Sequence, residues 1–298
     1  MSDFVNISEE TFMSKKKTLV LSDSTCDLSA EIVAARGIKI SPLTVVFGNE
    51  SHRDGIDVAP QDVYDYYKAS GQLAKTTATN IAEHEEFINA NVAPDEEAVY
   101  FAISSEMSTT FNNARMATED MDNVYCIDSH NLSTGIGLLV LHACDLADEG
   151  KSAKEIYDEI NTLVDKVDAS FVVDTLEFLH KGGRCSSVAA LGANLLKLHP
   201  MIQVKDGKMS VAKKYRGKMN EILKQYVSEK LADENKFIGK RLFITHSGNC
   251  DEIALELKAM TEAAYPDKEV LITRAGCTVS CHCGPGTLGI LGIRENNI

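Results

Sequence analysis

The chain has 298 residues, enough for about two domains, and its 44% hydrophobic and 25% charged residues are ordinary for a globular protein. No apolar run approaches the ~18 residues of a membrane span, and residues 1–16 carry acidic side chains where a signal peptide would be basic. The formal net charge of −14 argues against nucleic acid and anionic membranes as partners, since the basic residues cluster only weakly, at Lys213, Lys214, Arg216 and Lys218.

The first half of the chain alternates short apolar runs with helical patterns. TLVLSD (18–23) predicts a strand, residues 29–37 predict a helix that stops at Gly37, and residues 38–48, which contain Pro42, predict an edge or irregular strand. The elements expected next are helices over 60–71 and 81–91, a strand over 98–104, a helix near 109–118, a strand over 124–128 and a long helix over 133–150. Repeated strand, loop and helix units predict a three-layer α/β/α arrangement around a mostly parallel sheet.

The second half has a different, α+β pattern. A helix over 152–167 leads into it, and Asp206-Gly207 between two alternating runs predicts a β-hairpin. The other elements expected here are a strand over 169–175, an apolar helix near 187–198, helices over 219–235 and 251–264, strands over 241–247 and 269–276, and a glycine-rich closing strand. We place the boundary near residue 165. The expected domains are an N-terminal α/β domain (1–165, with 1–16 as a lead-in) and a C-terminal α+β domain (166–298).

Hydroxyl-rich loops follow three of the predicted parallel strands. These loops are SDST (22–25), SSEMSTT (104–110) and DSHNLS (128–133). Ligands in such sheets bind at the carboxyl ends of the strands, so we expect the three loops to surround one crevice. For any single one of these hydroxyls, helix capping is the favoured explanation, and it is the expected convergence of three such loops that points to a ligand.

The cysteine-rich run CTVSCHC (277–283) could supply zinc ligands, but its spacing is not that of a standard knuckle. Buried small hydrophobes are the expected role of these cysteines, so we predict no metal site. A metal-dependent regulator stays as an alternative. With eight cysteines and no export signal, reduced thiols are the default. We therefore expect a cytoplasmic protein without nucleic-acid partners and without stable membrane insertion.

Two motifs in the second half point to an anion. Gly182-Gly183-Arg184 indicates either backbone that approaches another group closely, with a fixed arginine fork, or a helix C-cap with a surface arginine. His282 stands before Gly284-Pro285-Gly286, whose rigid backbone would position the ring as a donor, although a lone histidine is more often structural. The chain contains no phosphate loop, dinucleotide fingerprint or nucleophile elbow, which disfavours an ATPase, a dehydrogenase or a serine hydrolase.

Taken in order, the motifs resemble those of the DegV family across residues 18–292. The matching segments are Asp23-Ser24-Thr25, Pro42-Leu43, Asp54-Gly55-Ile56, Lys75-Thr76-Thr77, Ile103-Ser104-Ser105, Asp128-Ser129, Thr175-Leu176, Gly182-Gly183-Arg184 and His282 with its Gly-Pro-Gly. The chain departs from the family pattern at 77–80 (TATN), at Thr109 in place of glycine, and at His199 in place of lysine.

The resemblance implies a two-domain carrier that holds one long-chain fatty acid and presents its carboxylate to a separate fatty acid kinase subunit. It implies no catalytic residue and no cofactor apart from the bound fatty acid. The residues implied for the carboxylate are Thr76, Thr77, Ser104, Ser105, Arg184 and His282, with Ser24, Ser129 and Gly183 as secondary candidates. The alternative is an enzyme, a phosphotransferase or acyl hydrolase that uses His282 and a nearby serine.

Overall fold

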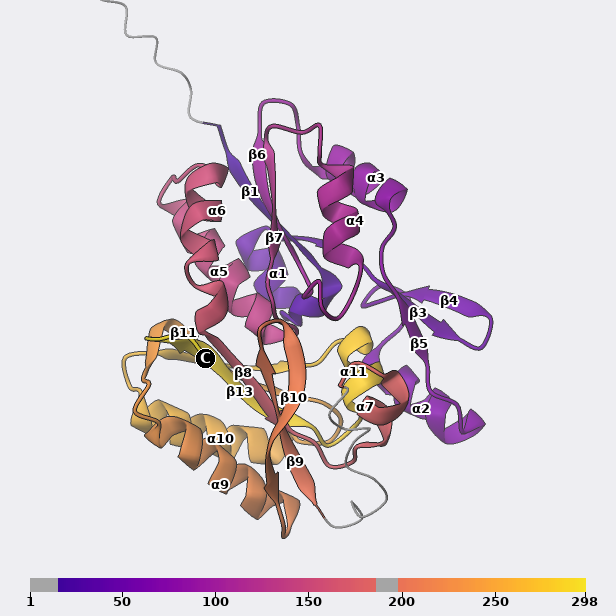
Figure 1. Cartoon of the computed structure of the whole chain (residues 1–298), viewed down its shortest axis with the longest axis vertical. Helices are drawn as coiled ribbons and strands as arrows, with labels where there is room; N and C mark the ends of the chain where they lie inside the picture. Colours follow the sequence, from indigo (N-terminus) through magenta and orange to yellow (C-terminus); the bar gives the residue numbers. More distant parts are fainter. Residues whose placement is uncertain (1–15, 186–197) are drawn as a thin grey trace, which may run out of the picture.

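The computed structural model describes residues 16–185 and 198–298, and Figure 1 shows how its elements are arranged. The apolar helix that the sequence predicts near 187–198 lies outside the described residues. The strands form a four-stranded sheet, a six-stranded sheet and a small three-stranded sheet. Nearly all predicted elements are present, and the fold is α/β with a parallel sheet and a second sheet domain, as predicted.

The four-stranded sheet is parallel throughout and has helices on both faces. In spatial order its strands are β2 (Lys39–Ser41), β1 (Thr18–Asp23), β6 (Glu97–Ala102) and β7 (Val124–Asp128). One face packs against α3 (Ile81–Asn91) and α4 (Thr110–Ala117), and the other against α5 (Thr134–Asp148) and α6 (Ala153–Asn161). The predicted three-layer arrangement is therefore confirmed.

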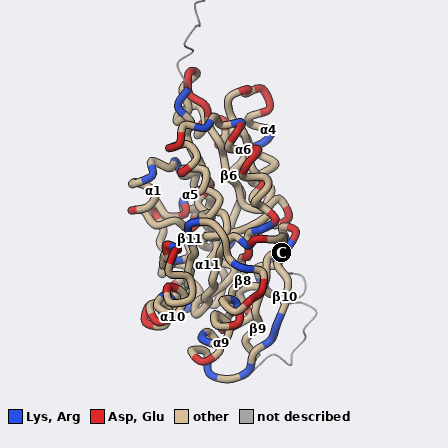
Figure 2. The backbone as a smooth tube through the Cα atoms, turned by 90° about the vertical axis from the view of Figure 1, so that its left-hand side faces the viewer, with Lys and Arg blue, Asp and Glu red and all other residues tan. Residues whose placement is uncertain are grey.

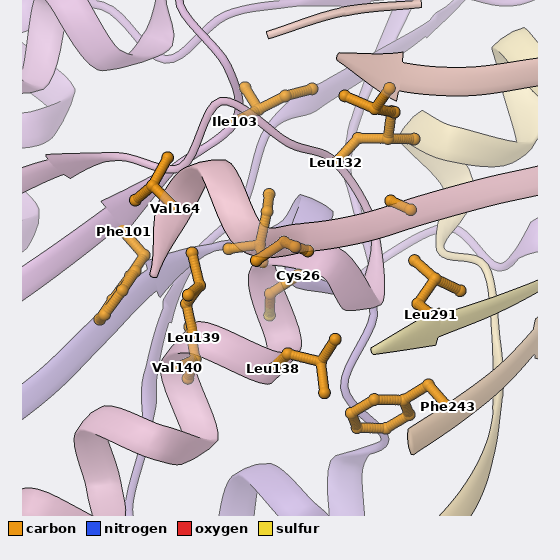
Figure 3. Packing of buried hydrophobic residues seen from close by; sticks show 14 of the residues in the cluster. Cys26, Phe101, Ile103, Leu132, Leu138, Leu139, Val140, Val164, Phe243 and Leu291 are labelled. Carbon is orange, nitrogen blue, oxygen red and sulfur yellow. The ribbon is translucent and has the colours of Figure 1, made fainter. Parts of the chain in front are cut away.

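Helix α5 lies between the two large sheets (Figure 1). It contacts β1 and β6 of the first sheet as well as three strands of the second. Twelve of its residues are buried, because its sequence TGIGLLVLHACDLAD is apolar nearly all round. A Cβ on Gly137 would lie 2.9 Å from the Cys26 carbonyl oxygen, so the glycine allows close packing. Figure 3 shows Leu138 of this helix near Phe243 of the second sheet.

The six-stranded sheet is mixed and is built around the last strand of the chain. Its spatial order is β10 (Lys208–Tyr215), β9 (His199–Lys205), β8 (Val167–Val172), β13 (Leu288–Arg294), β11 (Phe237–His246) and β12 (Glu269–Arg274). Helices α9 (Met219–Ala232) and α10 (Asp251–Ala264) pack on one face. The predicted hairpin is confirmed, since Asp206 and Gly207 have φ values of 50° and 74° between β9 and β10.

A small antiparallel sheet and three short helices complete the described structure. Residues 38–48 divide at Pro42, so that β2 joins the first sheet while β3 (Thr44–Phe47) pairs with β4 (Glu50–Arg53) and β5 (Lys75–Thr77). Four helices of the described structure remain outside the layers named so far. They are α2 (Pro60–Ser70) and the short helices α1 (Ala30–Arg36), α7 (Glu177–Gly182) and α11 (Cys277–Cys283). Strand β5 and helix α11 were not predicted from the sequence, and both carry residues of the site described below.

Buried charges tie β13 to its surroundings. Arg294 donates from Nη2 to Asp168 Oδ2 at 2.7 Å, and Lys230 donates to Asp168 Oδ1 at 2.8 Å. All three side chains are nearly inaccessible to solvent. This buried network depends on Asp168, because removing its carboxylate would leave two buried cations uncompensated.

The basic cluster of the sequence lies on and beside β10, the edge strand of the second sheet, where Figure 2 shows blue segments. Lys213 is paired with Glu229, 2.8 Å away, so part of its charge is already neutralised. Acidic and basic segments alternate over the rest of this view. Across residues 16–185 and 198–298, every helix is too short or too polar to cross a membrane.

Candidate ligand-binding site

A cavity opens where the loop after β6 meets α11, β5 and the end of α7. We call it the outer cavity; it holds about 530 Å³ of empty space, including the part open to solvent. Apolar side chains such as Leu43, Ile103 and Met209 form most of its wall. Its polar lining residues are Thr76, Thr77, Ser108, Arg184, Thr278 and His282.

A second cavity adjoins the first, between the loop that precedes α5, helix α11 and the second sheet; it holds about 390 Å³ of empty space, including the part open to solvent. We call it the inner cavity. Leu132, Val279 and Cys283 line both cavities, so the two adjoin at these residues. Every residue that lines the inner cavity is buried, including Phe171 of β8 and Leu291 of β13. The two together form a recess with polar groups at its surface end.

His282 and Thr76 form the centre of the polar end. His282 Nε2 lies 2.9 Å from Thr76 Oγ1, and β5 holds Thr76 in place by pairing it with Val45. Burial, with a smaller contribution from the positive charge of Arg184, lowers the pKa of His282 to about 4, so the ring is neutral at pH 7. Nδ1 has no hydrogen-bond partner among the described residues. We therefore assign the proton to Nε2, which donates to Thr76 and leaves the threonine hydroxyl free to donate to a ligand.

The Gly182-Gly183-Arg184 motif fits both interpretations of the sequence. A Cβ on Gly182 would lie 2.5 Å from His282 Nδ1, so the backbone does approach another group closely. Gly183 is the left-handed C-cap of α7, with φ 70°. Arg184 is exposed, donates from Nη1 to the Gly182 carbonyl at 2.8 Å and lines the outer cavity. The motif thus packs against the histidine and places a cation at the mouth.

Two buried carboxylates hold the N-terminus of α11, the helix that carries His282. Asp27 accepts from the Gly276 amide at 2.8 Å, and Asp54 accepts from the amides of Cys277 at 2.9 Å and Thr278 at 3.0 Å. Burial raises the pKa of Asp27 well above its usual range. These acceptors satisfy the free amides that begin every helix. The loop after β1 therefore positions α11 from the far end of the sequence.

Two of the three hydroxyl-rich loops reach the outer cavity, through Ser108 and Leu132, whereas the loop 22–25 does not line it, and most serines of the three loops bond within the protein. Ser24 donates to Asp54 at 3.1 Å and lines a wider groove of about 870 Å³ on the other side of the carboxylates. Ser104 is fully buried and donates to the Gly207 carbonyl at 2.8 Å. Ser129 donates to the Asn131 carbonyl at 3.2 Å. These contacts connect loops instead of facing the cavity.

The structure thus brings part of the predicted set together. The predicted residues that line the outer cavity are Thr76, Thr77, Arg184 and His282. Those that do not line it are Ser24, Ser104, Ser105, Ser129 and Gly183. The sequence analysis missed Ser108 and Thr278. Thr278 stands four residues before His282, and this spacing could have indicated it once residues 277–283 were seen as a helix.

The cysteines of α11 are buried, as expected. Cys277, Cys281 and Cys283 are each at most 3% exposed, and burial raises the pKa of Cys281 to about 12, which keeps it a neutral thiol. Within the described parts of the chain, no group of three or more histidine, cysteine, aspartate or glutamate residues is arranged to hold a metal ion. The packing of these thiols into the core accounts for their clustering in the sequence.

This architecture defines a class of protein: an α/β protein that encloses a recess with apolar walls and polar groups at its outer end. The chain belongs to the DegV family: the family model, described as "Uncharacterised protein, DegV family", matches residues 17–295. It is 31% identical over 286 residues to a DegV domain-containing protein of Clostridium perfringens, covering 92% of this chain and 97% of that one. A DegV domain-containing protein of Staphylococcus aureus is 30% identical, with coverages of 94% and 99%.

Solved structures of the family have the same fold. A DegV family protein from Thermus thermophilus, described by its fatty acid binding, superposes with a TM-score of 0.83 at 25% identity, covering 93% of this chain and 99% of that one. DegV from Bacillus subtilis, described as a fatty acid binding protein, superposes with a TM-score of 0.79 at 26% identity. The match covers 94% of this chain and 100% of that one. A stearic acid-binding protein from Eubacterium ventriosum superposes with a TM-score of 0.79 at 26% identity. The match covers 94% of this chain and 98% of that one.

Proposed function

We propose that this protein binds one long-chain fatty acid, with the carboxylate at the polar end of the outer cavity and the acyl chain directed into the inner cavity. The observation that carries the proposal is the adjacency of the two cavities, which share Leu132, Val279 and Cys283. The hydroxyls of Ser133, Ser247 and Thr287, which line the inner cavity, donate to acceptors within the protein. The family relatives with fatty acid binding in their descriptions support the choice of ligand.

The energetics of an acyl chain fit an apolar recess. Burying a methylene group contributes about 0.8 kcal/mol, so ~14 methylenes contribute ~11 kcal/mol before the costs of ordering. A carboxylate removed from water needs compensating donors. Thr76 and Arg184 supply a hydroxyl and a guanidinium at the same end of the cavity, so the ligand would be oriented with its carboxylate outward.

An outward carboxylate would be accessible to another protein, and we include in the proposal that a separate kinase subunit phosphorylates it there. The lining residues Thr77 and Arg184 are exposed, which leaves this end of the cavity at the molecular surface. An arginine fork binds carboxylates and phosphates alike, so Arg184 could hold the acid before transfer and the acyl phosphate afterwards. The kinase presentation rests on this chemistry and on the family resemblance.

The enzyme alternative has less support from the geometry. A histidine that acts as a base for a hydroxyl nucleophile is ordinarily oriented by a third group on its other ring nitrogen. His282 does lie beside the Thr76 hydroxyl, but its Nδ1 packs against Gly182 and has no partner among the described residues. Turnover of an acyl phosphate by the isolated protein, lost in His282→Ala, would favour the enzyme over the carrier.

Native mass spectrometry of the purified protein, with extraction of anything bound, tests the binding proposal directly. We expect one fatty acid per chain. The variant Arg184→Ala should bind palmitate about tenfold more weakly, because a hydrogen bond to a charged group is worth about 1.5–3 kcal/mol. Arg216→Ala is the matched control, since Arg216 is also exposed but does not line the cavity. A protein that carries no lipid and takes up neither palmitate nor oleate would refute the proposal.

A reconstituted reaction tests the kinase part separately. With ATP, palmitate and a fatty acid kinase subunit, acyl phosphate should form only when this protein is present. Formation of acyl phosphate at the same rate without this protein would contradict the presentation role while leaving the binding proposal intact.

A further inference from the structure

A buried hydroxyl without a partner stands at the polar end of the outer cavity. Thr278 is 4% exposed, and its Oγ1 has no hydrogen-bond partner among the described residues. The residue lines the outer cavity. A buried donor that is left unpaired costs about 1–3 kcal/mol. A ligand that accepts from this hydroxyl would therefore recover a penalty that the free protein carries.

The position of Thr278 on α11 aligns it with the known donors. Thr278 and His282 are four residues apart on the same helix, so their side chains lie on one face, one turn from each other. Val279 and Cys283 repeat the spacing one residue later and line both cavities. Helix α11 thus presents a polar row to the outer end of the recess and an apolar row along its length.

The backbone around Thr278 is held by the carboxylate of Asp54. Its amide donates to Asp54 Oδ2 at 3.0 Å, and the preceding amide donates to the other oxygen of the same carboxylate at 2.9 Å. Asp54 is itself buried. A hydroxyl on such an anchored backbone is pre-organised, which lowers the ordering cost of binding.

The other hydroxyls of the cavity are engaged or exposed. Ser108 is 2.8 Å from the Thr110 hydroxyl, and Thr76 is bonded to His282. Thr77 is exposed to solvent. Among the hydroxyls that line the described cavity, Thr278 is therefore the buried one whose oxygen makes no hydrogen bond, whereas Thr76 accepts from His282 and keeps its own proton for a ligand.

We infer that Thr278 is a ligand of the bound carboxylate, donating its hydroxyl proton to one oxygen while Thr76 donates to the carboxylate from the neighbouring strand. The inference rests on the proposed function and deepens it. In this arrangement the acyl chain leaves the head group along Val279 and Cys283 toward the inner cavity. Thr278 would then select ligands that end in an anionic acceptor.

Thr278→Val is the direct test, because valine keeps the branched shape and removes only the hydroxyl. Palmitate affinity, measured by calorimetric titration, should fall about tenfold. Thr278→Ser, which restores the hydroxyl, should bind within about threefold of the natural sequence. Thr261→Val is the control, since Thr261 is also a buried helical threonine but donates to the Leu257 carbonyl in α10. It should leave the affinity unchanged.

Two outcomes would overturn the assignment. Thr278→Val with unchanged affinity would exclude the hydroxyl as a ligand, and equal losses in Thr278→Val and Thr278→Ser would point to packing instead of hydrogen bonding. Methyl palmitate gives a further readout, because without a charged acceptor its affinity should change much less in Thr278→Val; an equal change would also contradict the inference. Failure of the unmodified protein to bind palmitate would instead refute the proposed function, and this assignment with it.

Discussion

Replacing Gly182 with alanine tests how the site holds its histidine. A Cβ at this position would lie 2.5 Å from His282 Nδ1 and 3.4 Å from its Cε1. Non-bonded atoms in contact sit about 3.5–4.0 Å apart, so the imidazole must move by about 1 Å. Its hydrogen bond to Thr76, 2.9 Å long, would then stretch beyond the normal range. The site would lose the arrangement that leaves the Thr76 hydroxyl free for a ligand.

We expect Gly182→Ala to weaken palmitate binding about tenfold, measured by calorimetric titration. The free energy of unfolding should not fall much, because alanine is about 1 kcal/mol more favourable than glycine in a helix. Gly183→Ala is the matched control. At φ 70° it carries left-handed strain of about 1–2 kcal/mol, but its Cβ meets no atom of the described residues within 4 Å. Unchanged binding in Gly182→Ala, or an equal loss in Gly183→Ala, would refute the reasoning.

Three further predictions concern stability, each measured by urea unfolding. Ser104→Ala should lower the free energy of unfolding by about 1–2 kcal/mol without changing palmitate affinity, because the Gly207 carbonyl loses its donor; weakened binding would contradict this. Asp168→Asn should cost about 3–5 kcal/mol, because the buried cations Arg294 and Lys230 lose the carboxylate that they share, and a loss below 1 kcal/mol would contradict it. Burial lowers the pKa of His282 from 6.5 to about 4, so between these pH values the unfolded chain binds a proton at this histidine and the folded protein does not. The free energy of unfolding should therefore be highest above pH 6.5 and fall as the pH falls toward 4. His282→Gln should flatten the pH profile in that window, and an unchanged profile would contradict the prediction.

Elements with local signals could be predicted from the sequence. Helix α1 begins after Ser29, whose side chain accepts from the Ile32 amide, and ends at Gly37 with φ 65°. Both capping residues lie next to the helix in sequence, so the pattern contains the whole explanation. The hairpin at Asp206-Gly207 is local in the same way.

The site depended on contacts that no local pattern contains. Strand β5 has only three residues, and Thr76 becomes part of a strand because Val45 pairs with it. Asp27 follows the hydroxyl-rich loop 22–25 in the sequence, yet it accepts from the Gly276 amide, 249 residues further on. Ser104 was expected to face a ligand, but the hairpin turn at Gly207 packs against it and takes its hydrogen bond. Residue type identified the polar loops, and tertiary contacts decided which of their side chains face the cavity.

The central place of β13 has a consequence for the order of folding. β13 is the last strand along the chain, yet it pairs with both β8 and β11, with Leu288 opposite Val172 and Leu291 opposite Phe243. The β9–β10 hairpin can close from neighbouring residues, whereas the β8–β13 pair must bring together distant parts of the chain, which is slow. Leu291 and Gly289 also line the inner cavity. The compartment for an acyl chain therefore takes shape in a late step of folding, and a nascent chain whose first sheet is already formed still lacks it.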